Sequence, residues 1–145
     1  YSNRNEEATN LLNTAIAQDP NNSQLYHAMG SVYESGIKDP VKAEEYYTKA
    51  LSLDPNNAAA LSNLGRIFYN QGVNKLGEAN LISDAKKYNE EKEIAKEFFR
   101  KALPHFEKAH QINPKEREYM TALRGIYYNL DMSKEFDEME AKMEQ

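Results

Sequence analysis

The feature that most constrains this sequence is a pattern of Ala, then Leu or an aromatic residue, then Ala and Pro, which occurs three times. Its members are separated by four, three and five residues, at Ala8-Leu12-Ala15-Pro20, Ala43-Tyr47-Ala50-Pro55 and Ala102-Phe106-Ala109-Pro114. Steps of three and four residues place side chains on one face of a helix, and a proline ends a helix. The sequence therefore predicts three similar helices, each with a buried stripe and each stopped by a proline turn.

A second pattern follows the first two proline turns. Its two copies, again at helical spacing, are Tyr26-Met29-Gly30-Tyr33 and Leu61-Leu64-Gly65-Phe68. Asn-Asn follows each of these prolines, and asparagine is a favoured cap at the start of a helix. Each glycine removes a side chain where the paired helix comes close, and we expect the small Ala43 and Ala102 to lie opposite the two glycines. Helices that pack in pairs in this way, with a turn between pairs, are typical of an α-solenoid.

The period and the residue order resemble the tetratricopeptide repeat, or TPR, whose unit is a helix pair of about 34 residues. The resemblance covers nearly the whole chain and implies an all-α superhelix of about three and a half repeats, in which one unpaired helix precedes three pairs. We treat residues 1–145 as a single TPR domain, and we expect a piece of a longer protein because the chain begins with Tyr1 rather than Met. The predicted helices are 5–18, 23–36, 40–53, 58–82, 89–112, 116–130 and 133–144.

The third repeat is longer than the others. Pro20 and Pro55 are 35 residues apart, whereas Pro55 and Pro114 are 59 apart, so roughly 25 residues exceed the usual repeat length. We assign residues 70–100 to a helical insertion, in which both helices of the pair run longer as an antiparallel hairpin. Its tip is predicted at 83–89, with Asn89 capping the return helix. The projecting flank is a candidate second contact surface, with Val73, Leu81, Ile82 and Phe99.

The last repeat departs from the pattern at two positions. Arg124 stands where glycine is expected, and Phe136 stands where the small alanine is expected. These changes put the close packing of the last pair in question and suit a terminal cap, which needs one polar face.

The stretches around the insertion resemble a narrower group of repeat proteins. The segments Phe68-Tyr69-Asn70-Gln71-Gly72-Val73-Asn74 and Lys101-Ala102-Leu103-Pro104-His105-Phe106-Glu107-Lys108-Ala109 look like TPR proteins of undefined role that are common in Bacteroidetes-type bacteria. The resemblance implies a bacterial protein. It favours a periplasmic or envelope-associated location over a cytoplasmic one.

Composition and motifs argue against catalysis and against nucleic-acid binding. The chain has 23 acidic and 18 basic residues and a net charge of −5, whereas affinity for phosphate backbones comes mostly from Lys and Arg. Cysteine is absent, and His105 and His110 are five residues apart rather than the four that suit two metal ligands on one helix. No apolar run approaches the roughly 20 residues of a membrane-spanning helix. We therefore predict no catalytic residue, metal, cofactor, nucleic-acid partner or membrane span.

The expected function is that of a scaffold without enzymatic activity. It would bind a protein or peptide in the concave groove that the first helices of successive pairs line in TPR proteins. Register against the repeat places the candidate binding residues in this groove: His27, Ser31, Glu34, Asn63, Arg66, Tyr69, Asn70 and Tyr128. Tyrosine offers contact area, rigidity and a polar tip, and Arg66 is the prominent cation. The simpler interpretation is that these positions only face solvent.

Two other functional interpretations stay open. The chain can be an accessory domain of a larger enzyme or transport complex. It can also be a self-assembly module that forms a homo-oligomer through its repeat ends or through the inserted hairpin. The carboxylate clamp of chaperone-binding TPR proteins is rejected, because Asn63 matches that motif but His27 and Ser31 replace its Lys and Asn.

Overall fold

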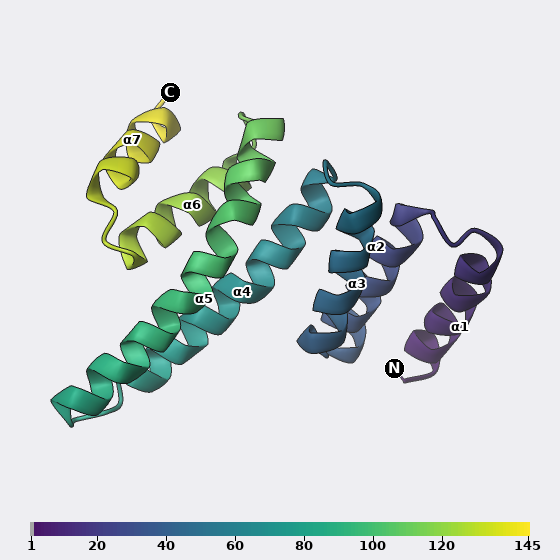
Figure 1. Ribbon diagram of the computed structural model, residues 1–145, viewed down its shortest axis with the longest axis horizontal. Coiled ribbons are helices and arrows are strands. Elements are labelled where there is room, and N and C mark those ends of the chain that lie inside the picture. The colour runs from purple at the N-terminus through teal and green to yellow at the C-terminus, as the bar shows by residue number, and fades with distance from the viewer. Residues whose placement is uncertain (1) are drawn as a thin grey trace. The chain divides into compact units, whose positions relative to one another are not determined.

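The computed structural model describes residues 2–145, and this part of the chain contains helices and turns but no β-strand. In chain order the elements are α1 (Ser2–Gln18), α2 (Ser23–Ser31), the π-helix η1 (Val32–Ile37), α3 (Pro40–Leu53), α4 (Ala58–Ala79), α5 (Ala85–Ile112), α6 (Arg117–Asn129) and α7 (Ser133–Met143) (Figure 1). The predicted all-α fold of paired helices is confirmed. The chain forms two compact units, which divide in sequence between Leu61 and Ser62.

The first unit is built around the pair α2 and α3, with α1 packed against α2 and η1. Asn22 caps α2 by accepting a hydrogen bond of 3.1 Å from the backbone N–H of Gln24, as predicted for the residue that follows the proline turn. Asp39 caps α3 in the same way, and Pro40 takes the first helical position, where its missing N–H is harmless. Local signals therefore set the start of each helix in this pair, and the predicted bounds of α3 are confirmed.

The C-terminal end of α2 widens into the π-helix η1. The chain then turns through Lys38, whose backbone is left-handed with a φ of 65° and whose N–H donates to the carbonyl of Tyr33. Gly36 lies in η1 against α1, because a β-carbon there would collide with the side chain of Asn5. The wider turn and the glycine together let α1 pack closely on this end of the pair.

Both units contain the same contact between a glycine and an aromatic ring. A β-carbon on Gly30 would stand 2.6 Å from ring carbons of Tyr47, and a β-carbon on Gly65 would stand 2.7 Å from a ring carbon of Phe106. Both rings are buried. Each glycine thus makes room for a large side chain of the partner helix.

The alanines were expected to be the neighbours of these glycines. Ala43 and Ala102 are fully buried, but the atoms nearest to the glycines belong to the rings one helical turn further along the partner helix. The glycine therefore accommodates a ring rather than a close approach of two small residues.

In the second unit, α4 and α5 extend this packing along a longer hairpin (Figure 1). Gly72 faces Phe99, whose ring carbons would lie 3.0 Å from a β-carbon at that position. One turn further toward the tip, Lys75 pairs with Glu91 at 2.6 Å. The two helices are therefore held side by side by a steric contact and by an ion pair, and the chain reverses at residues 80–84.

Two expectations about the hairpin are wrong. Asn89 lies inside α5, because Asp84 caps this helix by accepting a hydrogen bond of 2.9 Å from the backbone N–H of Lys87. An aspartate at this earlier position already satisfies a free N–H of the first turn, so the helix begins before Asn89. Phe99 does not belong to a projecting flank but is buried, whereas Leu81 at the tip is exposed.

The terminal pair α6 and α7 replaces the glycine and the ring by an ion pair. Arg124 and Glu140 occupy the register positions of the glycine and the ring, and their charged groups are 3.3 Å apart. Phe136, which stands where alanine is expected, has its ring centroid 6.0 Å from that of Tyr128. At this register an electrostatic contact therefore replaces the steric one, and Phe136 adds an aromatic contact with Tyr128.

Candidate functional site

The candidate residues lie on α2, η1, α4 and α6. Among the described residues, no helix combines the length and the apolar character that crossing a bilayer requires. In the same part of the chain, no three His, Asp or Glu side chains gather in a way that would ligate a metal ion.

In the first unit, two of the candidate residues contact the buried ring of Tyr47. The Tyr47 hydroxyl donates a hydrogen bond of 2.7 Å to Oε1 of Glu34, and the ring of His27 is tilted against the Tyr47 ring with 5.6 Å between centroids. Partial burial lowers the pKa of His27, while the carboxylate of Glu34 acts in the opposite direction. Ser31, one helical turn after His27, is exposed. Tyr47 thus orients two of these three side chains.

In the second unit, α4 and α6 bring two charged side chains together. Arg66 on α4 reaches Glu118 on α6, with 3.9 Å between its Nη1 and Oε1 of the glutamate, and both side chains stay partly exposed. A pair of this kind at a solvated surface contributes roughly 0–1 kcal/mol to stability. The pair with Glu118 is therefore a weak contact at the surface.

The ring of Tyr69, which belongs to α4, contacts residues of α5 and α6. Its ring meets the Phe99 ring edge to face with 5.4 Å between centroids, and its hydroxyl oxygen would lie 2.5 Å from a β-carbon on Gly125. The position of this half-buried ring therefore depends on a glycine at position 125. Asn70, the next residue, is exposed, and Asn63 is half-buried two turns earlier on α4.

Tyr128 lines a cleft that was not predicted from the sequence. The cleft has a volume of about 480 Å³ and is formed by the ends of the long hairpin together with α6 and α7. We call it the tyrosine cleft; its lining includes Leu76, Asn80, Tyr88, Lys92, Lys96, Phe99, Tyr127, Tyr128, Asp131, Met132, Phe136 and Asp137. Its size lies within the range of roughly 300–1,000 Å³ that is usual for ligand pockets. The one hint in the sequence was Phe136, an aromatic residue where the repeat calls for alanine.

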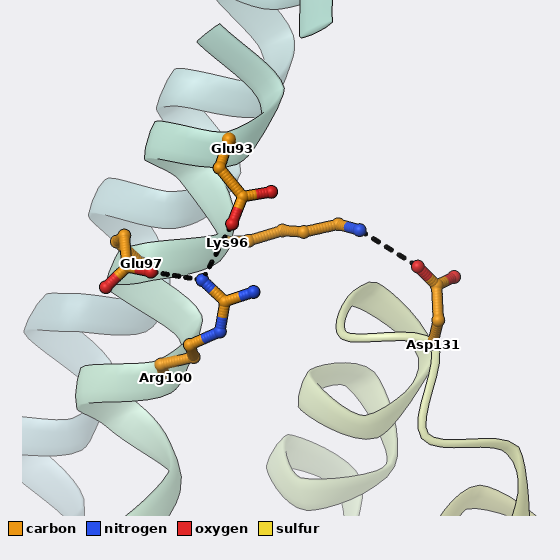
Figure 2. A network of polar contacts seen from close by, with 5 residues as sticks. All are labelled: Glu93, Lys96, Glu97, Arg100 and Asp131. Carbon is orange, nitrogen blue, oxygen red and sulfur yellow. Dashed lines mark hydrogen bonds and ion pairs between the residues drawn. The ribbon is translucent and has the colours of Figure 1, made fainter. Parts of the chain in front are cut away.

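Charged side chains tie α5 to the turn after α6, as Figure 2 shows. Lys96 reaches Asp131 at 2.9 Å, while Arg100 pairs with Glu93 at 2.9 Å and also with Glu97 on its own helix. The hydrogen bond from Lys96 holds the pKa of Asp131 below its ordinary range. Asp131 has a left-handed backbone with a φ of 58°, a conformation that aspartate tolerates at the end of a helix. One side of the cleft is thus closed by an ion pair.

The inner side of the cleft is a neutral phenol. Tyr127 is buried, and its hydroxyl donates a hydrogen bond of 3.4 Å to Oε2 of Glu107. Burial, together with the negative charge of Glu107, raises the pKa of Tyr127 to about 12. The phenol therefore stays uncharged at alkaline pH values at which an ordinary tyrosine ionises.

The comparisons with known proteins agree with the repeat pattern. Residues 42–72 match the family model of the TPR repeat. Residues 42–72 are thus a tetratricopeptide repeat, and the three copies of the spacing and the paired helices agree with this match. The narrower resemblance to Bacteroidetes-type proteins stays a prediction.

Similar proteins match only parts of their own length. The cellulose synthase operon protein C of Xanthomonas axonopodis pv. citri is 37% identical over 78 residues, which make up 54% of this chain and 5% of that protein. The type IV pilus assembly protein PilF of Pseudomonas aeruginosa is 35% identical over 66 residues, or 46% of this chain and 26% of that protein. This chain thus spans about a quarter or less of these relatives. A solved structure of the MamA RS-1 ArsTM double mutant covers 95% of this chain and 82% of its own, with 23% identity and a TM-score of 0.46.

Proposed function

We propose that this chain is a scaffold without catalytic activity, which binds a protein or peptide partner on the face that α4 and α6 share in the second unit. Tetratricopeptide repeats serve in general as protein-interaction scaffolds. The observation that carries the proposal is the pair of Arg66 and Glu118, because it places a cation with an exchangeable carboxylate on two neighbouring first helices. A ligand carboxylate in place of Glu118 would accept a charge-assisted hydrogen bond from Arg66.

Three further residues suit this role. Tyr69 is held by Phe99 and by the contact with Gly125, so its ring loses little conformational freedom when a partner binds. Asn70 is exposed and offers both a donor and an acceptor to a peptide backbone. Asn63 adds a second amide on the same helix. Together with Arg66, these side chains provide one charged anchor, one aromatic anchor and polar groups for orientation.

His27, Ser31 and Glu34 are the proposed contacts of the first unit. Glu34 is positioned by the Tyr47 hydroxyl, and the exposed Ser31 offers a hydroxyl that can donate and accept. His27 prefers the neutral form because burial lowers its pKa, so it would act as a neutral hydrogen-bonding group rather than as a cation. These residues would add recognition by polar groups, and we expect single substitutions among them to have smaller effects than the loss of Arg66.

A second candidate function is that of an accessory domain in a larger assembly at the bacterial envelope. The partial match to a protein named as a type IV pilus assembly protein favours this alternative. Fractionation of the native organism, with an antibody against this chain, tests the location. We expect the protein in the periplasmic or membrane fraction, and recovery in the cytosolic fraction alone would contradict an envelope role.

The binding proposal is tested by partner capture. The immobilised protein is exposed to a lysate of the native organism, and captured proteins are identified by mass spectrometry. We expect Arg66→Ala combined with Tyr69→Ala to lose the specific partner while the helical circular dichroism signal is retained. The milder Tyr69→Phe, which keeps the ring, separates lost contacts from lost packing.

Arg100→Ala is the matched control, because Arg100 also bridges carboxylates but lies on α5. This variant should capture the partner as the parent does. Unchanged capture by the variant at positions 66 and 69, or an equal loss in the control, would place the binding surface elsewhere.

A further inference from the structure

The helix α1 carries the apolar stripe of a second helix, but the stripe is only half-buried. In α3 and α5 the residues at this register are at most 3% exposed: Ala43, Tyr47, Ala50, Ala102, Phe106 and Ala109. The equivalent residues of α1, which are Ala8, Leu12 and Ala15, keep part of their surface in solvent. Within the described residues, α1 packs mainly against α2 and η1, which belong to the following pair. One side of its stripe therefore stays uncovered.

Leu11 on the same face of α1 gives a second comparison. Its equivalent in α3 is Tyr46, whose ring stacks on Tyr33 of η1 with 5.4 Å between centroids. Its equivalent in α5 is His105, whose ring stacks on Phe68 of α4 with 5.9 Å between centroids. Leu11 is instead 73% exposed. In both complete pairs an aromatic ring of the first helix covers this position, whereas in α1 the leucine faces solvent.

We propose that a further helix of the first type packs on this face of α1, and that the same polypeptide supplies it directly ahead of residue 1. The required side chains follow from the pair α2–α3. Gly30 faces the equivalent of Leu12, so the added helix needs a small residue at that position. Tyr33 faces the equivalent of Leu11, so a large apolar residue is needed three positions later.

The connections between the helices favour the same polypeptide as the source. In each complete pair the first helix comes directly before the second in the chain. In the first unit only Lys38 and Asp39 join them, because η1 ends at Ile37 and α3 begins at Pro40. Consecutive helices joined by short connections are usually neighbours in space. A helix that continues this order would reach α1 from the side of residue 1 and extend the stack by one pair.

Covering the face would stabilise α1 in two ways. It would remove the apolar surface of Leu11 from water, together with the exposed parts of Ala8 and Ala15. It would also give α1 neighbours on two sides, and a helix of this length gains most of its stability from tertiary packing. An added first helix should therefore raise the stability of the first unit.

The proposal is tested by adding a first helix to the full chain. A copy of residues 21–35 is fused directly ahead of Tyr1, so that the copied glycine precedes Leu12 by 17 residues, as Gly30 precedes Tyr47. We expect the fusion protein to melt about 8 °C or more above the parent, because the helix buries apolar surface of α1. A fusion that carries the same added residues in shuffled order is the control and should melt like the parent.

Leu11→Gln tests whether the added helix lies on the predicted face. Glutamine keeps the helix propensity and adds no charge. In the parent this substitution should shift the melting temperature by about 4 °C at most, because Leu11 is exposed. In the fusion protein it should remove about half of the gain or more. Leu81→Gln is the matched control, since Leu81 is 89% exposed but lies at the hairpin tip, and it should leave the gain intact.

The source of the helix is tested with the native protein, purified from its organism as a single polypeptide. Hydrogen exchange is compared between this protein and the chain of 145 residues. We expect the backbone amides of residues 7–16 to exchange about tenfold or more slowly in the native protein, because a covered helix opens less often. Equal exchange rates would show that its own polypeptide does not cover α1.

Sedimentation velocity of the parent distinguishes a second copy as the occupant. We expect Leu11→Gln to leave the sedimentation unchanged at every concentration. A dimer of the parent that this substitution disrupts would overturn the proposal in favour of contact between two copies. A fusion protein that melts like the parent, or a gain that Leu11→Gln leaves intact, would also overturn it. None of these measurements involves Arg66, so a failure here is distinguishable from a failure of the binding proposal.

Discussion

In the ordinary pair α2–α3, one glycine makes room for one aromatic ring of the partner helix. In the extended pair α4–α5, two glycines do so. When the two pairs are aligned on Gly30 and Gly65, the position of Ile37 at the end of η1 corresponds to Gly72. When the second helices are aligned on Tyr47 and Phe106, the position of Pro40 at the start of α3 corresponds to Phe99. Where the ordinary pair stops with a π-turn and a proline, the extended pair adds another glycine and another ring. Helix length in this protein therefore follows the number of such contacts.

The terminal pair α6–α7 shows a third solution at the same register. Arg124 and Glu140 form an ion pair where the other pairs bury a ring against a glycine. A charged pair at a partly exposed position stabilises less than a buried ring, but it leaves the last helices with a polar surface. The three pairs thus form a series from one ring contact to two and then to none, and substitutions along this series should differ in their effects.

The largest expected effect comes from removing the ring. Phe106→Ala should lower the free energy of unfolding of the second unit by about 3–5 kcal/mol, because the residue is buried and its loss leaves a cavity beside Gly65. Tyr47→Ala in the first unit should cost at least as much, since that pair has one such ring and the Tyr47 hydroxyl also holds Glu34. Urea denaturation followed by circular dichroism measures both changes.

Phe98→Ala serves as the control for Phe106→Ala, because Phe98 is on the same helix but is only half-buried. Its destabilisation should be clearly smaller. Equal effects of the two substitutions would show that the contact between the glycine and the ring does not organise this pair.

The next effect tests the glycine. Gly65→Leu should lower the free energy of unfolding by about 1–3 kcal/mol, because the new side chain overlaps the Phe106 ring. Gly77→Ala is the opposite case: no atom lies within 4 Å of its hypothetical β-carbon, so alanine should stabilise the helix by roughly 0.5–1 kcal/mol. Thermal melting of both variants should show a lower melting temperature for Gly65→Leu and a higher one for Gly77→Ala. A melting temperature that rises in Gly65→Leu would contradict the proposed packing.

A smaller effect is expected at the terminal pair. Arg124→Ala, Glu140→Ala and the combined variant form a double-mutant cycle whose coupling energy should be roughly 0.2–1 kcal/mol, because both side chains are partly exposed. The coupling should fall at high salt, which screens exposed charges. A coupling energy comparable to that of the buried ring would mean that the terminal pair is not a polar cap but a second core.

The smallest expected effect concerns pH. Burial lowers the pKa of His105, whose ring is stacked on Phe68 with 5.9 Å between centroids. The folded state thus disfavours the protonated form, so the stability is highest above the unfolded pKa of about 6.5 and decreases as the pH falls below it. His105→Gln should reduce the difference in unfolding free energy between about pH 8 and about pH 5.5. A His105 resonance that titrates above the unfolded value in an NMR experiment would contradict this sign.

Most helix ends could be predicted because their signals are local. The turns at Pro20 and Pro55 and the cap at Asn22 act on neighbouring residues, and the structure confirms the helices around them. The start of α5 was misplaced because two cap residues compete there, and the spacing of charges after Asn89 favoured the wrong one. Asp84 caps the helix because it is the last residue of the chain reversal and its carboxylate accepts a hydrogen bond from the backbone N–H of Lys87.

The surroundings of the candidate binding residues were only partly predictable. Helical register placed Arg66 and Tyr69 on α4 correctly, but it contained no information about the carboxylate that Arg66 would meet or the ring that would hold Tyr69. Phe99 was assigned to an exposed flank because the apolar stripe of a long helix does not reveal which of its members has a glycine opposite. That choice depends on the relative shift of two helices, which is a tertiary property.

By itself, the sequence determined the helices, their pairing in tetratricopeptide repeats and the existence of a longer third pair. Periodicity, caps and proline stops operate within a few residues, so they can be read from one chain. Only the tertiary structure decided that the glycines receive rings and that Arg124 meets Glu140. It also decided that α5 passes close enough to the turn after α6 to form the tyrosine cleft. Arg124 and Glu140 are 16 residues apart in the sequence, and Gly65 and Phe106 are 41 apart. Local sequence patterns do not predict which residues so far apart come into contact.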